Sequence, residues 1–147
     1  MPDVSPAHPA AGVSLAPDVR AFLEEPRFAV LSTINPNGSP HTALVWYLID
    51  DDGIVINSAE GRRWPSNLRR DPRISVAVHD GHDWVSIRGV VEVIEDQAQS
   101  QADIAAMAFK YDSREDAERS ITNQFTRQQR VSFRLRPSAV HVEFGGE

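Results

Sequence analysis

The sequence predicts a mainly β fold, a small antiparallel barrel with helices at its periphery. About six short segments are rich in Val, Ile, Leu and aromatic residues, as β-strands are. Turn signals that contain Gly, Pro, Asn or Asp separate most of these segments by only a few residues, which is typical of antiparallel hairpins. The long stretch of helical composition comes late, at about residues 96–127, so it does not alternate with the strands as a parallel α/β fold requires.

The length and composition fit one globular domain. With 147 residues, the chain is long enough to bury roughly 70% of the surface that it exposes when unfolded. Residues 1–17 hold four of the ten prolines, and we expect them to form a disordered N-terminal arm. Residues 18–147 are then expected to form a single barrel domain with a helical insertion at about 96–127.

The first half of this domain predicts one short helix and three strands. The helix follows a proline, spans Asp18–Glu25 and has its apolar residues on one side. A turn is expected at Asn35–Gly38, because Asn and Gly tolerate positive φ and Pro fixes the corner. A second turn is expected at residues 50–53. The strands are expected at Phe28–Ile34, His41–Ile49 and Ile54–Asn57.

The second of these strands, His41–Ile49, is almost continuously apolar. This pattern predicts that both of its faces are buried. Trp46 and Tyr47 are adjacent in it and therefore point to opposite faces of the sheet. We expect one of the two rings in the core and the other toward a ligand groove.

The second half of the domain predicts a hairpin, a pair of helices and a strand at the end. Apolar segments on either side of Asp80-Gly81 indicate the hairpin. A stretch rich in Ala, Gln, Glu and Asp indicates the helices, and Pro137 interrupts the last strand. The expected ranges are Ile74–His79 and Trp84–Ile94 for the hairpin strands, Asp96–Tyr111 and Arg114–Thr126 for the helices, and Val131–Arg136 and Ala139–Phe144 for the two parts of the last strand.

The basic segment before the hairpin is the strongest functional signal. Its only acid is Asp71, although the whole chain has a net charge of −6. Guanidinium groups beside the N-terminus of a short helix bind phosphate or carboxylate, because unpaired N–H groups and the helix dipole add to the charge. On charge alone, a solvated basic loop is the alternative. The arginines of this segment are Arg62, Arg63, Arg69, Arg70 and Arg73.

Several kinds of partner and location are not expected. No apolar run approaches the ~20 residues that span a membrane, and the N-terminus lacks the features of a signal peptide. A pI near 5.3 disfavours nucleic-acid binding, which needs a basic face. The chain has no cysteine, which excludes disulfides, thiolate metal sites and cysteine nucleophiles. We therefore expect a cytoplasmic protein.

The histidines of the hairpin turn do not predict a metal site. His79 and His82 lie three residues apart, a spacing that suits one face of a helix. Asp80-Gly81 between them indicates a hairpin turn instead, and the sequence offers no evident third ligand. No motif of a serine hydrolase, a zinc protease or a P-loop is present, which argues against those chemistries.

Three stretches of the sequence, in this order, resemble the split-barrel flavin and deazaflavin oxidoreductases, the relatives of pyridoxamine phosphate oxidase. They are FAVLSTINPNGSPHTALVWYL, INSAEGRRWPSNLRRDPRISVAV and WVSIRGVVEVIED. The resemblance is closest to the coenzyme F420-dependent group and covers about Arg27–Asp96 and, more weakly, Val131–Phe144. It implies a split β-barrel that binds a flavin-like tricycle at the interface of a homodimer.

The resemblance also implies the positions of the cofactor site. The phosphate tail is implied at Arg62, Arg63, Ser66 and Asn67. The path between phosphate and ring is implied at Asn57, Ser58 and Ala59. The ring pocket is implied at the strand that begins with His41 and at the hairpin that holds Trp84.

Trp64 departs from the family pattern, because several members carry Lys at this position. An indole cannot pair with phosphate, although its face can stack on a ring or cover an aliphatic linker. Arg63 is the residue that can replace the lost charge. Several arginines suit the long anionic tail of F420, whereas Trp64 weakens the preference for F420 over FMN.

The resemblance implies hydride transfer from reduced coenzyme F420 to a small conjugated or unsaturated molecule. Two alternatives stay open, an FMN-dependent reductase or oxidase and a non-catalytic carrier of flavin, deazaflavin or haem. No catalytic residue is assigned, because the cofactor supplies the reactive chemistry and water or any of several side chains can donate a proton. The candidate donors are His41, Tyr47, His79 and His82.

A homodimer is also expected from surface coverage. The strands are long and largely apolar, and the chain has few helices to cover their outer faces. A second copy of the chain would cover this surface and complete a groove that one small barrel is too narrow to enclose.

Overall fold

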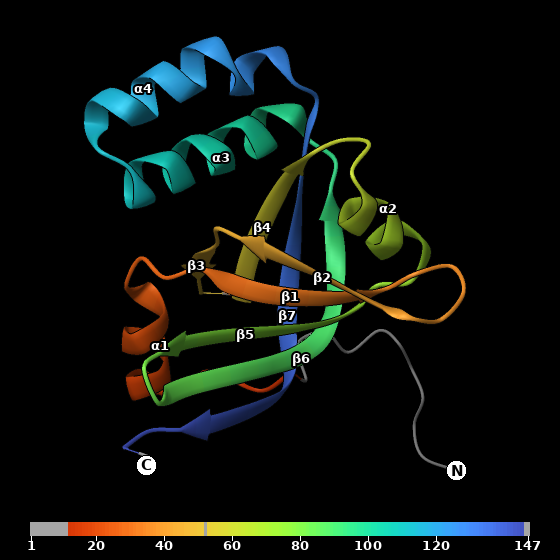
Figure 1. Ribbon diagram of the computed structural model, residues 1–147, viewed down its shortest axis with the longest axis vertical. Coiled ribbons are helices and arrows are strands. Elements are labelled where there is room, and N and C mark those ends of the chain that lie inside the picture. The colour runs from red at the N-terminus through yellow and green to blue at the C-terminus, as the bar shows by residue number, and fades with distance from the viewer. Residues whose placement is uncertain (1–11, 52, 146–147) are drawn as a thin grey trace.

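The structure is a computed structural model that describes residues 12–51 and 53–145 (Figure 1). Residues 1–11 of the predicted N-terminal arm lie outside the described residues. The following residues lead into helix α1 (Pro17–Glu24), and the Val13 N–H donates to the Pro137 carbonyl oxygen at 2.8 Å.

The elements that follow α1 agree in type and order with the sequence-based expectation, apart from a division of the second strand. They are β1 (Ala29–Ile34), β2 (Pro40–Val45), β3 (Leu48–Asp50), β4 (Gly53–Ala59), α2 (Arg63–Arg70), β5 (Arg73–Asp80), β6 (Asp83–Ile94), α3 (Gln97–Tyr111), α4 (Arg114–Asn123), the 3₁₀ helix η2 (Phe125–Arg127) and β7 (Arg130–Glu143).

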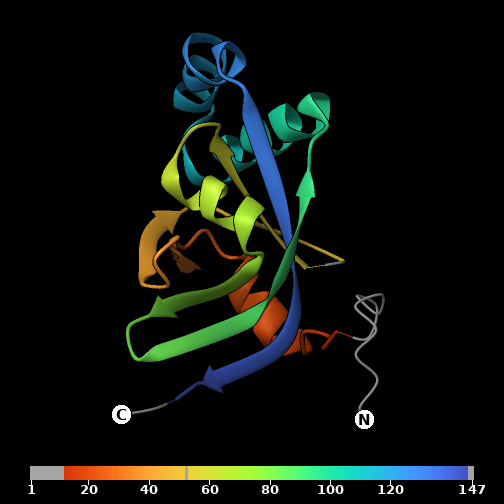
Figure 2. The same cartoon turned by 90° about the vertical axis from the view of Figure 1, so that its right-hand side faces the viewer.

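In the described residues the strands form one seven-stranded antiparallel sheet, in the order β2-β1-β5-β6-β7-β4-β3. Its two edges, β2 and β3, follow each other in the sequence and are joined only by Trp46 and Tyr47. Such a link spans roughly 11 Å at most, so the sheet must curl until its edges lie close together. Figures 1 and 2 show this curl. The fold is therefore a split β-barrel, as predicted, open between β2 and β3.

The prediction for His41–Ile49 was wrong in two respects. The segment breaks at Trp46 and Tyr47, and its first part is an edge strand whose residues alternate between exposed and half-buried. Leu44 is 70% exposed. An apolar run predicts burial on both faces only if both faces are covered, and within the described residues one face of β2 stays exposed.

The last strand is also simpler than predicted, because β7 continues through Pro137 without a break. Gly89 of β6 pairs with Pro137, whereas Arg88 pairs with Ala139, so Ser138 is an extra residue in a β-bulge. A Cβ atom on Gly89 would lie 2.3 Å from the Arg136 carbonyl oxygen. Glycine therefore permits the close approach of β6 and β7 at the bulge.

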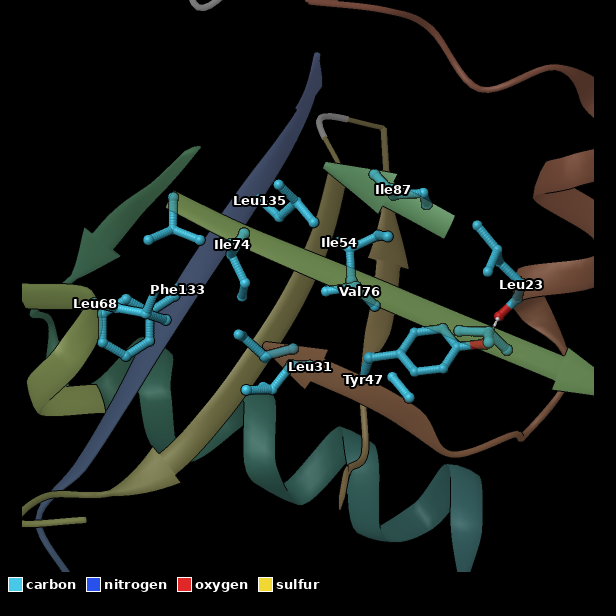
Figure 3. Packing of buried hydrophobic residues seen from close by; sticks show 14 of the residues in the cluster. Leu23, Leu31, Tyr47, Ile54, Leu68, Ile74, Val76, Ile87, Phe133 and Leu135 are labelled. Atoms are coloured by element: carbon cyan, nitrogen blue, oxygen red, sulfur yellow. Dashed lines mark hydrogen bonds between the residues drawn. The ribbon is translucent and has the colours of Figure 1, made fainter. Parts of the chain in front are cut away.

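The barrel core is built from the inward residues of the strands and is closed by a helix at each end. β1 and β5 bury alternate residues, as strands with one face inward do. Figure 3 shows Leu68 of α2 near Phe133 at one end and Leu23 of α1 near Tyr47 at the other. The Tyr47 hydroxyl donates to the Leu23 carbonyl oxygen at 2.7 Å. Tyr47 is fully buried, which places this ring in the core as one of the two expected alternatives.

A second apolar cluster lies between the barrel and the helical insertion. α4 runs back along α3 in the opposite direction at one end of the molecule, and α3 is the helix of the pair that lies against β4 and β7 (Figure 1). Side chains of Asp96 and Ser113 cap the first turns of α3 and α4. The predicted helix to Thr126 instead ends at Asn123 and is followed by the short η2. The buried residues of this cluster are Val55, Ile104, Met107, Ala108, Ala117 and Phe125.

The described residues lack two further kinds of feature. None of the helices there is both long enough and apolar enough to span a membrane. The same residues contain no group of three or more His, Cys, Asp or Glu side chains that is placed to hold a metal ion.

Candidate functional site

A cleft of about 440 Å³ lies between the barrel and the helical insertion. This volume is in the usual range of small-molecule sites, roughly 300–1,000 Å³. The cleft has an apolar wall and a polar, cationic end. The apolar wall is formed by Phe28, Leu44, Trp46, Ile104, Met107 and Phe125. The polar end is formed by Asn57, Ser58, Arg62 and Arg130, beside Trp64.

Trp46 is the flat part of the apolar wall. Its ring stacks on Tyr111 of α3, with 5.1 Å between the ring centroids and an angle of 6° between the planes. Tyr111 also lies behind Phe28, at 5.9 Å between centroids. The aromatic wall therefore has α3 as its support. Of the two adjacent rings, Tyr47 is in the core and Trp46 lines the cleft, although both residues lie in the bend between β2 and β3 and not in a strand.

The bend between β2 and β3 is held by the last turn of α3. The Tyr111 hydroxyl accepts from the Tyr47 N–H at 3.4 Å and donates to the Arg27 carbonyl oxygen at 2.5 Å. Lys110 Nζ donates to the Tyr47 carbonyl oxygen at 3.1 Å and lies 4.2 Å from the centre of the Tyr47 ring. Both polar groups of the Tyr47 backbone are thus satisfied by α3 instead of by a neighbouring strand.

Burial changes the ionisation of these groups. It lowers the pKa of Lys110 to about 8, although Glu24 and Glu25 act in the opposite direction. Burial raises the pKa of Tyr111 to about 12 and raises that of Tyr47 further. Both tyrosines are therefore neutral donors at physiological pH, and Lys110 is the group that titrates nearest to it.

Arg130, the first residue of β7, forms the floor of the cationic end. Its side chain is almost completely buried, with 4% of the residue exposed. Nε donates to Asn57 Oδ1 at 3.0 Å, and Nη1 donates to Gln128 Oε1 at 2.5 Å. Burial lowers the pKa of Arg130 to about 10, and the nearby Arg62 guanidinium lowers it as well.

The five arginines of the basic segment divide into two groups. Arg69 forms ion pairs with Glu60 at 2.6 Å and Glu95 at 2.7 Å, which tie α2 to the loops that follow β4 and β6. Arg73 pairs with Asp71, and Arg70 donates to the Ile34 carbonyl oxygen and to Asn67. Their guanidinium groups serve the fold.

Arg62 and Arg63 form the second group of the basic segment. Both are exposed, and within residues 12–51 and 53–145 neither guanidinium group forms an ion pair or a hydrogen bond. Of the five arginines, these two are available to an anionic ligand.

Four of the ten residues predicted for the cofactor site line the cleft. They are Asn57, Ser58, Arg62 and Trp64. Ala59 follows Ser58, and Arg63 lies between Arg62 and Trp64, but neither residue lines the cleft. Trp64 also packs against Phe133, at 5.7 Å between ring centroids, so it belongs both to the core and to the cleft.

The other four predicted residues lie away from this cleft. The Ser66 hydroxyl donates to the Arg62 carbonyl oxygen at 3.0 Å, and Asn67 is buried between α2 and β1. His41 is on the edge strand β2, where it pairs with Thr33. Trp84, 37% exposed at the start of β6, packs against His141 at 4.9 Å between ring centroids. A single copy of the chain does not bring these residues together with the cleft.

Sequence analysis missed Arg130 and the helical part of the apolar wall. Arg130 begins the polar face of a strand, Arg130-Ser132-Arg134-Arg136, which reads as a solvent-facing pattern. The first half of this face is instead covered by α3, because Ser132 donates to the buried Asp103 at 2.7 Å. The adjacent helical insertion was a signal that could have predicted this burial, because its helices need a face of a strand to pack against.

The comparisons with known proteins agree with this fold. Residues 15–142 match the family model described as pyridoxamine 5′-phosphate oxidase. No curated protein matches the chain. A conserved hypothetical protein from Mycobacterium tuberculosis has a similar structure, with a TM-score of 0.73 and 24% identity, over 90% of this chain and 86% of that one.

Two further solved structures have the same fold. One is an F420 reductase, with a TM-score of 0.65 and 21% identity, over 83% of this chain and 94% of the other. The other is HutZ, the haem storage protein from Vibrio cholerae, with a TM-score of 0.67 and 20% identity, over 91% of this chain and 98% of that one.

Proposed function

Because the chain belongs to the pyridoxamine 5′-phosphate oxidase family, we propose that the cleft binds a flavin or deazaflavin and that the protein is an oxidoreductase. The observation that carries this proposal is the combination of an aromatic wall with an arginine, Arg62, that has no partner in the described residues. A tricyclic ring with a phosphate tail has the matching combination of a flat apolar part and an anion. The residues present thus fit the group.

The finer part of the proposal is that the cofactor is coenzyme F420 and that a small conjugated or unsaturated molecule is reduced. Arg62 and Arg63 are adjacent, exposed and unpaired in the described residues, which suits a long anionic tail that leaves the cleft for solvent. The fold similarity to an F420 reductase also supports this choice.

The roles of the residues follow from the two ends of the cleft. When bound, the reduced cofactor supplies the hydride, and the protein supplies binding and orientation. Trp46 and Met107 offer apolar surface to the ring, while Trp64 covers the linker between ring and phosphate. Arg62 binds the tail and so fixes how far the ring enters the cleft.

We also propose that the protein is a homodimer. Phe28 is 60% exposed and Leu44 is 70% exposed, and both line the open side of the cleft. A second copy over these residues would bury the apolar surface and exclude water from the ring. The same arrangement would allow the partner subunit to complete the ring pocket.

The first test is a titration of the purified apo-protein with F420 and with FMN, followed by fluorescence and by calorimetry. Tight binding of F420 and weak binding of FMN would support the proposal, whereas the reverse would assign an FMN-dependent reductase or oxidase. Binding of neither would contradict the cofactor assignment. Turnover with reduced F420 and a panel of enones and quinones then separates an enzyme from a non-catalytic carrier of flavin, deazaflavin or haem.

Replacement of both free arginines tests where the tail binds. We expect the Arg62→Ala, Arg63→Ala double variant to bind F420 about tenfold or more weakly, because each charge-assisted contact is worth about 1.5–3 kcal/mol. The matched control is Arg88→Ala with Arg114→Ala, which removes the same charge from exposed positions outside the cleft. Equal affinity in the two double variants would show that the tail binds elsewhere. Circular dichroism checks that both variants keep the fold.

A further inference from the structure

Arg130 is a buried cation without a carboxylate partner. Within the described residues, its side-chain hydrogen bonds go only to the neutral amide oxygens of Asn57 and Gln128, and the Phe125 ring lies 5.0 Å from its guanidinium carbon. A buried guanidinium group that is not neutralised is costly, and such groups are normally paired. This arrangement therefore leaves a positive charge for a ligand to neutralise.

The electrostatics of the cleft strengthen this argument. Arg62 lies close enough to lower the pKa of Arg130, and both residues line the same cleft. None of the cleft-lining residues in the described part of the chain is Asp or Glu. Two like charges thus face one space that holds no acidic side chain, which is unfavourable unless an anion binds between them.

The donors that remain on Arg130 point to the same conclusion. A guanidinium group has five N–H donors, and the described residues engage Nε and one N–H of Nη1. Nη2 forms no hydrogen bond there. In the described residues, every side-chain nitrogen that is sealed from solvent has a hydrogen-bond partner. Nη2 is therefore accessible, and the cleft is the space that Arg130 lines.

A buried polar network fixes the position of Arg130. Asn57, which accepts from Arg130, donates to Ser132 Oγ at 2.8 Å and to the Ser100 carbonyl oxygen at 2.9 Å. The Gln97 side chain accepts from the Arg130 N–H at 2.9 Å and donates to its carbonyl oxygen. Strands β4 and β7 and helix α3 thus hold the guanidinium group in place before any ligand arrives.

We propose that Arg130 and Arg62 form an anion subsite for a phosphate group, with Arg130 as the buried floor and Arg62 as the exposed rim. That this phosphate belongs to a flavin or deazaflavin rests on the proposed function. The subsite shares Arg62 with the one that the resemblance implies, but it adds Arg130 and leaves out Ser66 and Asn67. The Asn67 side chain is fully engaged inside the protein, and the Ser66 hydroxyl donates to the Arg62 backbone.

The test uses the apo-protein with inorganic pyrophosphate as the probe and sodium chloride at equal ionic strength as the reference. We expect pyrophosphate to raise the melting temperature of the wild-type protein, with Kd increased about tenfold or more in Arg130→Gln and in Arg62→Gln. Arg88→Gln, an exposed arginine outside the cleft, is the matched control. Wild-type affinity in Arg130→Gln would overturn the proposal.

A second measurement observes binding by the wild-type protein itself, in case Arg130→Gln fails to fold. In ¹⁵N-labelled wild-type protein, the Nε–Hε resonance of Arg130 should shift during the pyrophosphate titration. The Arg130→Lys variant keeps the charge but lacks this N–H group. The resonance that is missing from its spectrum is therefore that of Arg130. An Arg130 resonance that does not move while other resonances titrate would also overturn the proposal.

The outcomes separate this subsite from the proposed function. The protein could bind pyrophosphate through Arg130 and yet bind neither F420 nor FMN. This result would support the subsite and contradict the cofactor assignment. Conversely, cofactor affinity that is the same in wild type and Arg130→Gln would contradict the subsite and leave the cofactor assignment intact.

Discussion

Asn67 has every polar atom of its side chain engaged within the protein. Nδ2 donates to Thr33 Oγ1 at 3.0 Å and to Asn35 Oδ1 at 3.1 Å, and Oδ1 accepts from Arg70 at 3.2 Å. These bonds join α2 to β1 and to the turn that follows it. The resemblance implied a phosphate contact here, but the geometry indicates a structural role.

Substitution of Asn67 separates these two roles. Asn67→Leu leaves the Thr33 hydroxyl without its buried partner, and we expect the free energy of unfolding to fall by about 2 kcal/mol. Urea denaturation measures this loss, with the exposed Ser66→Ala as the control, for which we expect less than about 0.5 kcal/mol. Folded Asn67→Leu should bind the cofactor like wild type. Weaker binding without a loss of stability would instead assign Asn67 to the ligand.

The arginines show how far the site could be predicted from the sequence. Their number and position drew attention to the segment that contains Arg62, and Arg62 lies at the cationic end of the cleft. The sequence could not separate Arg69 from Arg62, since Arg69 pairs with Glu95, a residue 26 positions away. Of the pairs in this segment, Asp71–Arg73 is local enough to be read from spacing.

At the scale of elements, the bend between β2 and β3 could not be predicted for a similar reason. The run of apolar residues from Ala43 to Ile49 has the pattern of one buried strand. The chain leaves the sheet at Tyr47 because Lys110 and Tyr111 of α3 satisfy its backbone groups. The cause of the break therefore lies more than 60 residues further along the chain.

The contact between α3 and this bend predicts a pH dependence of stability. The pKa of Lys110 is lowered from 10.5 to about 8 in the folded protein. Between these values the unfolded chain binds more protons than the folded one, so the contribution of Lys110 to stability rises with pH in this window. Below pH 8 the amine is charged in both states, and its contribution does not change with pH.

Lys110→Met is the variant that removes this titration. From pH 8 to 10.5 we expect the free energy of unfolding of wild type to increase by about 1–2 kcal/mol relative to that of Lys110→Met. This increase is smaller than the full pKa difference implies, because Lys110 is partly exposed and solvent screens its charge. Urea denaturation at several pH values measures the difference. A constant difference between the two proteins across this window would show that Lys110 is not the group involved.

At the scale of the whole molecule, the exposed apolar residues around the cleft predict a dimer. We expect wild type to sediment as a dimer in analytical ultracentrifugation. Leu44→Glu should raise the dissociation constant about tenfold or more, because it places a charge in a desolvated contact. Val90→Glu is the matched control, since Val90 is also exposed but lies outside the cleft. A monomeric wild type, or a dimer that Leu44→Glu leaves unchanged, would contradict the prediction.

The fold class, the order of elements and the pairing of hairpin neighbours could be predicted, whereas the pairing of strands far apart in the sequence could not. Hairpin neighbours such as β5 and β6 follow from the Asp80-Gly81 turn. The pairing of β4 with β7 joins Asn57 to Ser132, and no turn or periodicity specifies a contact over such a separation. Strand order therefore depends on how the whole sheet closes.

The place of β7 in the sheet has a consequence for how the protein is made. It follows the other six described strands in the sequence, yet it lies between β6 and β4 and joins β2-β1-β5-β6 to β4-β3. During synthesis, these six strands leave the ribosome before β7, so until β7 emerges the nascent chain lacks the strand that joins the two parts of the sheet. Arg130 and its partner Asn57 meet only when β7 is inserted. The cleft is thus complete only when β7 has joined the sheet, and a ligand of the cleft selects for chains in which this strand is in place.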